Sequence, residues 1–133
     1  MSVIPVGAPE PTEATRAFWT ELGLPGLHDL HTHFLPPQVM AKVRAQFDSA
    51  GPLIGREWPL RYRADDEVLT DVLRSLGVLS FTALPYAHRP DMAEWLNEWA
   101  AGFAARTPEA RACGTFFPEP DACLLYTSDA ADE

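Results

Sequence analysis

The feature that most constrains this chain is residues 27–37, LHDLHTHFLPP, where two histidines stand two positions apart near the end of an apolar-flanked run. The run predicts a β-strand. Because side chains alternate between the two faces of a strand, His31 and His33 should point the same way, with Asp29 two positions before them. The two prolines that follow favour the start of a helix, so both histidines should lie at the carboxyl end of the strand, where parallel-sheet folds place their chemistry. The pattern predicts a pair of metal ligands.

A His-x-His pair by itself is also compatible with solvated or hydrogen-bonded side chains on a half-buried strand. The full run, Asp-x-His-x-His followed by Leu-Pro-Pro and a helix, resembles the first strand of the amidohydrolase superfamily. The resemblance is to its amidohydrolase-related, aminocarboxymuconate-semialdehyde decarboxylase-like branch, which contains hydrolases and decarboxylases. It implies that His31 and His33 bind a divalent metal, which we expect to be zinc.

The rest of the chain alternates segments typical of helices and strands. We expect helices at 11–22, 37–48, 65–76 and 90–106, strands at 27–34, 78–84 and 112–117, and a long ordered loop at 49–64 that contains Trp58 and Tyr62. The helix at 37–48 should lay an apolar face on the sheet and expose Lys42 and Arg44. The helix at 65–76 should bury the stripe Val68, Leu69, Val72, Leu73 and Leu76. This order predicts an α/β fold with a parallel sheet.

Two further stretches, VLSFTALPYAHRPDMAEWLNEWAAGFAART and GTFFPEP, look like the second and third units of the same branch, so the resemblance covers residues 18–121. It implies the first three βα units of a (β/α)8 TIM-type barrel, truncated, because a closed barrel needs roughly 250 residues. We expect an arm and short helix at 1–26 and the partial barrel at 27–121. Residues 122–133 resemble a translated sequencing adaptor and are expected to be a non-native tail.

The resemblance also implies how the chemistry is divided along the full-length protein. In that family the remaining metal ligands and the acid–base carboxylate come from later strands. The expectation is therefore a metal-dependent enzyme that hydrolyses a C–N or C–O bond or decarboxylates its substrate, of which this chain alone is an inactive amino-terminal fragment with no catalytic residue of its own.

Several residues near the expected strand ends are candidates for a supporting role. His88 and Arg89 follow the second strand and Glu119 follows the third, so they are candidate contacts for a small-molecule substrate, although solvated loop residues show the same pattern. Asp29 either orients a histidine through a hydrogen bond or packs against the strand below. His28 should lie against a helix.

Charge and composition exclude some functions. The net charge of −9 would repel a nucleic-acid backbone or an anionic membrane, so neither is an expected partner. The amino terminus lacks the features of a signal peptide and no later stretch resembles a membrane span, which favours the cytoplasm. Cys113 and Cys123 have no zinc-knuckle or disulfide-framework spacing. The pattern leaves the oligomeric state open.

Two other functional classes begin with a similar motif. Phosphoesterases of the polymerase-and-histidinol-phosphatase type and TatD-like nucleases also carry His-x-His on a first strand. Those phosphoesterases usually continue toward a Ser, Asp, Gly loop, whereas FLPP here leads straight into a helix, and a nuclease fits poorly with the negative charge. A non-catalytic metal-binding module is the third alternative, and His88 would be its available additional ligand.

Overall fold

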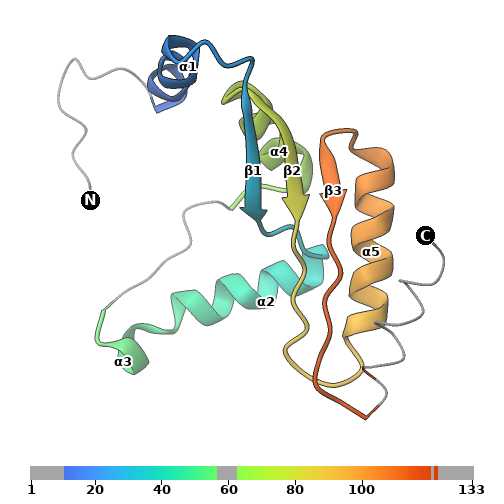
Figure 1. Cartoon of the computed structure of the whole chain (residues 1–133). Coiled ribbons are helices and arrows are strands. Elements are labelled where there is room, and N and C mark those ends of the chain that lie inside the picture. The colour runs from blue at the N-terminus through green and yellow to red at the C-terminus, as the bar shows by residue number, and fades with distance from the viewer. Residues whose placement is uncertain (1–10, 57–62, 121, 123–133) are drawn as a thin grey trace.

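The computed structural model describes residues 11–56, 63–120 and 122 (Figure 1). Its elements in chain order are α1 (Pro11–Glu21), β1 (Leu27–Thr32), α2 (Pro37–Asp48), α3 (Gly51–Ile54), α4 (Asp66–Ser75), β2 (Val78–Ala83), α5 (Ala93–Arg106) and β3 (Ala110–Ala112). Most boundaries lie within a few residues of the expected ones because each has a local cause. Asp65, for example, caps α4 by accepting a hydrogen bond from the Val68 N–H at 3.0 Å.

The three strands form one parallel sheet in the order β1-β2-β3. Leu27 of β1 lies opposite Val78 of β2, and Phe81 of β2 lies opposite Ala110 of β3. The chain crosses from β1 to β2 through α2, α3 and α4, and from β2 to β3 through α5. The prediction of an α/β fold with a parallel sheet is confirmed.

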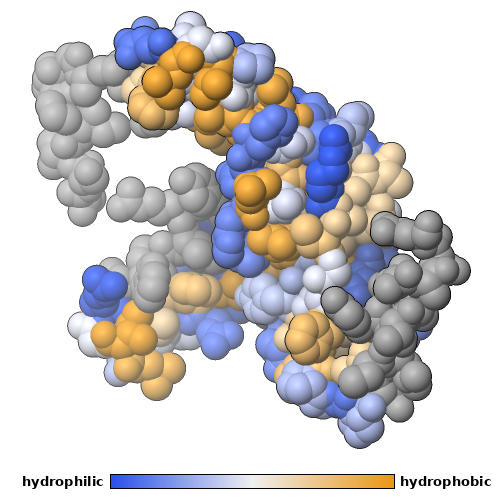
Figure 2. Space-filling model, in the orientation of Figure 1, coloured by the Kyte–Doolittle hydropathy of each residue, from blue (hydrophilic) through white to orange (hydrophobic). Residues whose placement is uncertain are grey.

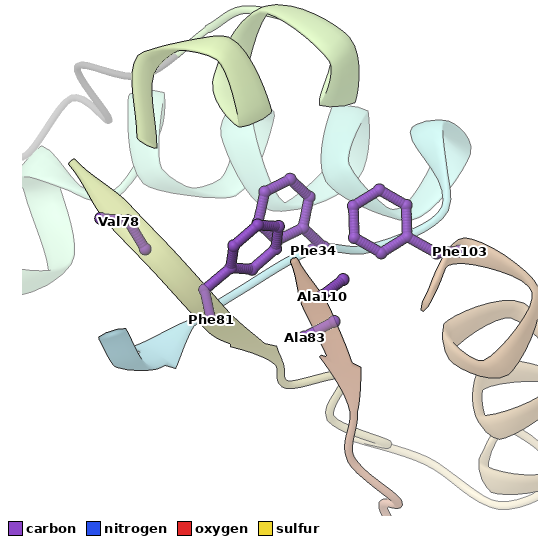
Figure 3. Close-up of a cluster of buried hydrophobic side chains, with 6 residues drawn as sticks. All are labelled: Phe34, Val78, Phe81, Ala83, Phe103 and Ala110. Atoms are coloured by element: carbon purple, nitrogen blue, oxygen red, sulfur yellow. The ribbon is translucent and has the colours of Figure 1, made fainter. Parts of the chain in front are cut away.

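The main hydrophobic core lies between the sheet and the helices α4 and α5. Three phenyl rings form its centre: Phe34 stacks on Phe81 with ring centroids 5.0 Å apart and on Phe103 at 4.7 Å (Figure 3). Val78, Ala83 and Ala110 complete the buried cluster, and Leu69 and Leu73 of α4, with Leu76 directly after the helix, pack against it. This packing fixes the sheet against one layer of helices.

The helix α1 is anchored by Trp19 at the amino end of the sheet. The Trp19 ring is buried, and its Nε1–H donates to the Leu76 carbonyl at 3.1 Å. Gly77 has φ +81°, and a Cβ built on it would lie 2.5 Å from a carbon of the Trp19 ring. Only glycine therefore permits this close contact between α1 and the turn that enters β2.

The third strand is shorter than predicted and begins earlier, at Ala110–Ala112 instead of 112–117. The Phe81 N–H donates to the Glu109 carbonyl, so alternate residues of β2 face β3. The next two residues that face β3 are Ala83 and Pro85, and Pro85 has no N–H to continue the hydrogen-bond ladder. The chain beyond β3 pairs with α5 instead: the Thr115 N–H donates to Asn97 Oδ1 at 2.8 Å, and Asn97 Nδ2 donates to the Thr115 carbonyl at 3.1 Å.

The helix α2 has the predicted bounds but a different partner. It was expected to lie on the sheet, yet Val39 packs with Leu35, Met92 and Leu96, in a second buried cluster at the start of α5. Figure 1 shows α2 running across the strand direction beyond the end of β1. Arg44, expected to be exposed, is partly buried and donates to the Ala64 carbonyl at 2.7 Å. The buried segment 34–36 connects β1 to this helix.

Part of the surface is apolar. Of the stripe expected to be buried on α4, Val68 and Val72 remain 49% and 41% exposed, because the core contacts only the side of the helix that carries the three leucines. Leu30 is 74% exposed. Figure 2 shows hydrophobic side chains gathered over α1 and around α3. None of the described helices is long and apolar enough to cross a membrane.

The segment 49–64, expected to be a loop, contains the short helix α3, which ends at Ile54 and is followed by Gly55 with φ +73°. Trp58 and Tyr62 lie outside the described residues.

Candidate metal-binding site

His31 and His33 lie at the carboxyl end of β1, as the position of the following prolines predicted. His31 is inside the strand, and His33 comes directly after its last residue, Thr32. Both side chains are exposed, and their ring centroids are 5.0 Å apart with planes 88° apart. Two imidazoles at this separation can turn their nitrogen lone pairs toward one ion.

The strand carries a local irregularity at this point. Asp29 lies opposite Phe81 and Thr32 opposite Ala83, so Leu30 and His31 together face the single residue Thr82. The Thr32 hydroxyl donates to the Thr82 carbonyl and closes the end of the strand. An extra residue of this kind changes the direction of the side chains next to it, and His31 is one of the two residues at this irregularity.

The orientation of His33 is set by the neighbouring strand. Its Nδ1 lies 2.9 Å from the Leu84 carbonyl oxygen, just beyond β2. A carbonyl can only accept, so Nδ1 carries the proton and donates it. This leaves the lone pair on Nε2, which is the arrangement in which histidines bind metals while their second nitrogen holds a backbone carbonyl.

Asp29 acts on the backbone. Its Oδ1 accepts a hydrogen bond from the backbone N–H of His31 at 3.0 Å. Two roles were considered for Asp29, orienting a histidine ring or packing against the strand below, and the contact that the structure shows is a local turn-like one to the main chain between the two residues. His28, expected to lie against a helix, is instead exposed, with Nδ1 2.7 Å from the Ser80 hydroxyl of β2.

Tyr86 is a neighbour of the pair that sequence reasoning did not single out. Its ring centroid is 5.7 Å from that of His33, with planes 85° apart, and 6.2 Å from that of His88. Burial raises the pKa of the Tyr86 hydroxyl above its ordinary value. Its place just after Pro85, beyond the end of the strand next to β1, was the signal that could have identified it.

The other predicted contacts lie apart from the ring pair. His88 and Arg89 are exposed and line a hollow of about 310 Å³ between α2 and the start of α5. Glu119 accepts a hydrogen bond from the Asp91 N–H at 3.3 Å, where Asp91 has φ +61°. His88 contacts the ring of Tyr86 and not the pair itself, whereas Glu119 supports the loop that leads into α5.

A larger hollow, about 890 Å³ in volume, lies elsewhere in the described chain. Its wall includes Arg44, Asp66, Arg74 and Arg106 from α2, α4 and α5, and its lining within the described part does not include either histidine of the pair. Burial raises the pKa of the Asp66 carboxyl, an effect that the positive charge of Arg106 opposes. The hollow is lined by charged side chains of both signs, and its described carboxylates do not come together as a group that could hold a metal ion.

The donor set fits part of a metal site. Neutral imidazole nitrogens are ligands that zinc and other divalent transition metals accept. Within residues 11–56, 63–120 and 122, no three His, Cys, Asp or Glu side chains come together around one point. The described residues therefore present two ligands, with the proton of His33 placed for binding.

No family model, curated protein or solved structure matches the chain.

Proposed function

We propose that His31 and His33 bind one divalent metal ion, which we expect to be zinc, and that the chain carries the amino-terminal ligands of a metal-dependent hydrolase or decarboxylase of the amidohydrolase type. The observation that carries this proposal is the hydrogen bond from His33 Nδ1 to the Leu84 carbonyl, beside a second imidazole at 5.0 Å. That bond leaves the His33 Nε2 lone pair for a ligand role.

The order of the elements supports a barrel origin. Consecutive parallel strands with helices between them, packed against one face, are how a (β/α)8 barrel begins, and the histidines lie at the carboxyl end of β1. We propose that β1, β2 and β3 are the first three strands of such a barrel. A small-molecule substrate would then bind beyond the carboxyl ends of β1 and β2.

Each residue near the pair has a separate task in this proposal. The Leu84 carbonyl holds the His33 ring, Asp29 holds the main chain at His31, and Tyr86 packs edge-on against His33. When bound, the metal supplies Lewis-acid activation of water and of a substrate carbonyl. The His88 ring lies 6.2 Å from the Tyr86 ring, centroid to centroid, and His88 can contact a substrate or serve as a further metal ligand.

Calorimetric titration with zinc tests the ligand assignment. We expect weak binding by the unmodified chain, because two imidazoles are fewer than the three protein ligands of a typical catalytic site. His31→Ala and His33→Ala should each weaken zinc binding by about tenfold or more. His28→Ala is the matched control, since His28 is an exposed histidine of the same strand whose Nδ1 contacts Ser80.

Equal losses in His28→Ala and His33→Ala would show non-specific histidine binding and overturn the assignment. An ester and amide hydrolysis assay on the same samples separates a partial site from a complete one, and we expect no turnover by this chain alone. Tight stoichiometric zinc binding with turnover abolished by His31→Ala would show that the chain builds a complete site unaided.

A further inference from the structure

The hollow of about 310 Å³ between α2 and the start of α5 has features of a binding site in its own right. We call it the α2–α5 hollow, and the residues that define it are Val39, Lys42, His88, Arg89, Met92 and Trp95. Neither His31 nor His33 is among the described residues that line it. Its volume is at the lower end of the range of small-molecule pockets.

The floor of the hollow is apolar and firmly packed. Val39 and Met92 are 6% and 3% exposed and belong to the second buried cluster, against which Trp95 also packs. A floor held by a buried cluster keeps its shape without a ligand, so binding need not order it. It offers an aliphatic and an aromatic surface to an apolar ligand.

The rim of the hollow is cationic. Lys42 on α2 and Arg89 in the loop after β2 are exposed, and no described acidic side chain forms an ion pair with either. No carboxylate stands among the described lining residues, although the chain as a whole has a net charge of −9. In the larger hollow, by contrast, Arg74 is paired with Asp71 and Glu109.

We propose that the α2–α5 hollow binds a small organic carboxylate with an apolar body. The carboxylate lies between the Lys42 ammonium and the Arg89 guanidinium, and the body lies against Val39, Met92 and Trp95. A guanidinium fork matches a carboxylate in geometry, and the two cations supply the charge that the floor lacks. Gln38 and Gln46 on the same wall add amide donors.

This proposal is independent of the metal site. His88 is the residue that the two proposals share, and neither requires it. The proposed metal ligands are His31 and His33, and the anion is held by Lys42 and Arg89. Loss of zinc binding would therefore leave carboxylate binding unchanged, and the two proposals fail separately.

Calorimetric titration of the full 133-residue chain with octanoate tests it, with octanamide as the uncharged analogue. We expect octanoate to bind more tightly than octanamide, and Lys42→Gln and Arg89→Gln each to weaken octanoate binding by about tenfold while leaving octanamide binding unchanged. Arg111→Gln is the matched control, because Arg111 is an exposed cation whose guanidinium contacts the Pro108 and Ala110 carbonyls.

A second measurement does not depend on the variants folding. Lys42 is the only lysine of the chain, so its acetylation can be followed as a single site by mass spectrometry. Octanoate should slow acetylation of Lys42 in the unmodified chain, and octanamide should not. Equal binding of the two analogues, equal loss in Arg111→Gln, inorganic phosphate binding as tightly as octanoate, or unprotected Lys42 would each overturn the proposal.

Discussion

At the scale of single residues, the candidate site depends on hydrogen bonds to the backbone. A backbone carbonyl at Leu84 sets the proton position of His33, and the Asp29 carboxylate accepts a hydrogen bond from the backbone N–H of His31. Backbone partners move little, because their positions are fixed by the sheet. The His33 ring is therefore held in one orientation by the backbone of the neighbouring segment.

Ionic contacts at this scale link the helices to the sheet. Arg74 of α4 donates from Nε and Nη2 to the two carboxylate oxygens of Glu109, at 2.9 and 3.0 Å, just before β3. The fork geometry makes this pair more specific than a single contact between exposed charges. It ties the end of α4 to the entry of the third strand.

The Arg74 pair predicts a pH dependence of stability. Hydrogen bonds from Arg74 hold the pKa of Glu109 below its ordinary value. A carboxyl whose pKa is lowered by folding contributes stability above its unfolded-state pKa, and this contribution is lost as the pH falls through the folded-state pKa. Glu109→Gln should therefore lower the urea midpoint at pH 7, and the difference from the unmodified chain should shrink below about pH 4.

Urea titrations at the two pH values measure the effect. Glu98→Gln is the control, because Glu98 is an exposed carboxylate of α5, and its midpoint should change little at either pH. A Glu109→Gln difference of the same size at both pH values would contradict a role for the ionised carboxylate.

At the scale of elements, close approaches decide where the helices lie. The contact of α1 with the turn before β2 requires Gly77, since a side chain there would enter the space of the Trp19 ring. The path of the chain after β3 depends on Asn97. Its side-chain amide accepts a hydrogen bond from the Thr115 N–H and donates one to the Thr115 carbonyl. Each of these residues joins elements that are distant in the sequence.

Two glycine substitutions should have opposite effects on stability. Gly77→Ala should reduce the free energy of unfolding by about 1 to 3 kcal/mol, because it adds left-handed backbone strain and a clash with Trp19. Gly102 lies inside α5, and a Cβ built on it would be 3.9 Å from Arg106 Nη1, an ordinary contact. Gly102→Ala should therefore raise the free energy of unfolding by about 0.5 to 1 kcal/mol. Urea unfolding followed by circular dichroism measures both, and a stabilised Gly77→Ala would show that the Trp19 contact is not required.

At the scale of the whole molecule, much apolar surface is left uncovered. β1 pairs only with β2 among the described strands, and Leu30 on that strand is 74% exposed. Edge strands with exposed apolar side chains pair readily with other chains. The described part of the chain therefore exposes an edge strand with an apolar side chain, a surface that favours association with other chains.

This surface predicts self-association that a single charge should reduce. We expect the purified chain to sediment as species larger than a monomer, and Leu30→Lys to shift the distribution toward the monomer, because a lysine on an edge strand opposes strand pairing. Leu53→Lys makes the same chemical change at an 87% exposed position on α3, away from the sheet, and should shift it less. Equal shifts would show that general hydrophobicity, and not the strand, drives association.

Sequence reasoning reached those parts of the site that depend on local pattern. The alternation in HDLHTHF was sufficient to expect two neighbouring imidazoles at a strand end, and their rings lie 5.0 Å apart. It did not reach the roles of Tyr86 and the Leu84 carbonyl, which come from the neighbouring strand. Such contacts depend on which residues the sheet register places side by side.

The same division holds for the fold. Local rules determined the bounds of α2, since a proline begins it and its apolar residues recur at helical spacing, and they determined the start of α4 through its cap at Asp65. The tertiary structure decided that α2 packs on α5 and that β3 ends at Ala112. These outcomes followed from Met92 and Pro85, distant in sequence, because packing and strand pairing join residues that no local pattern relates.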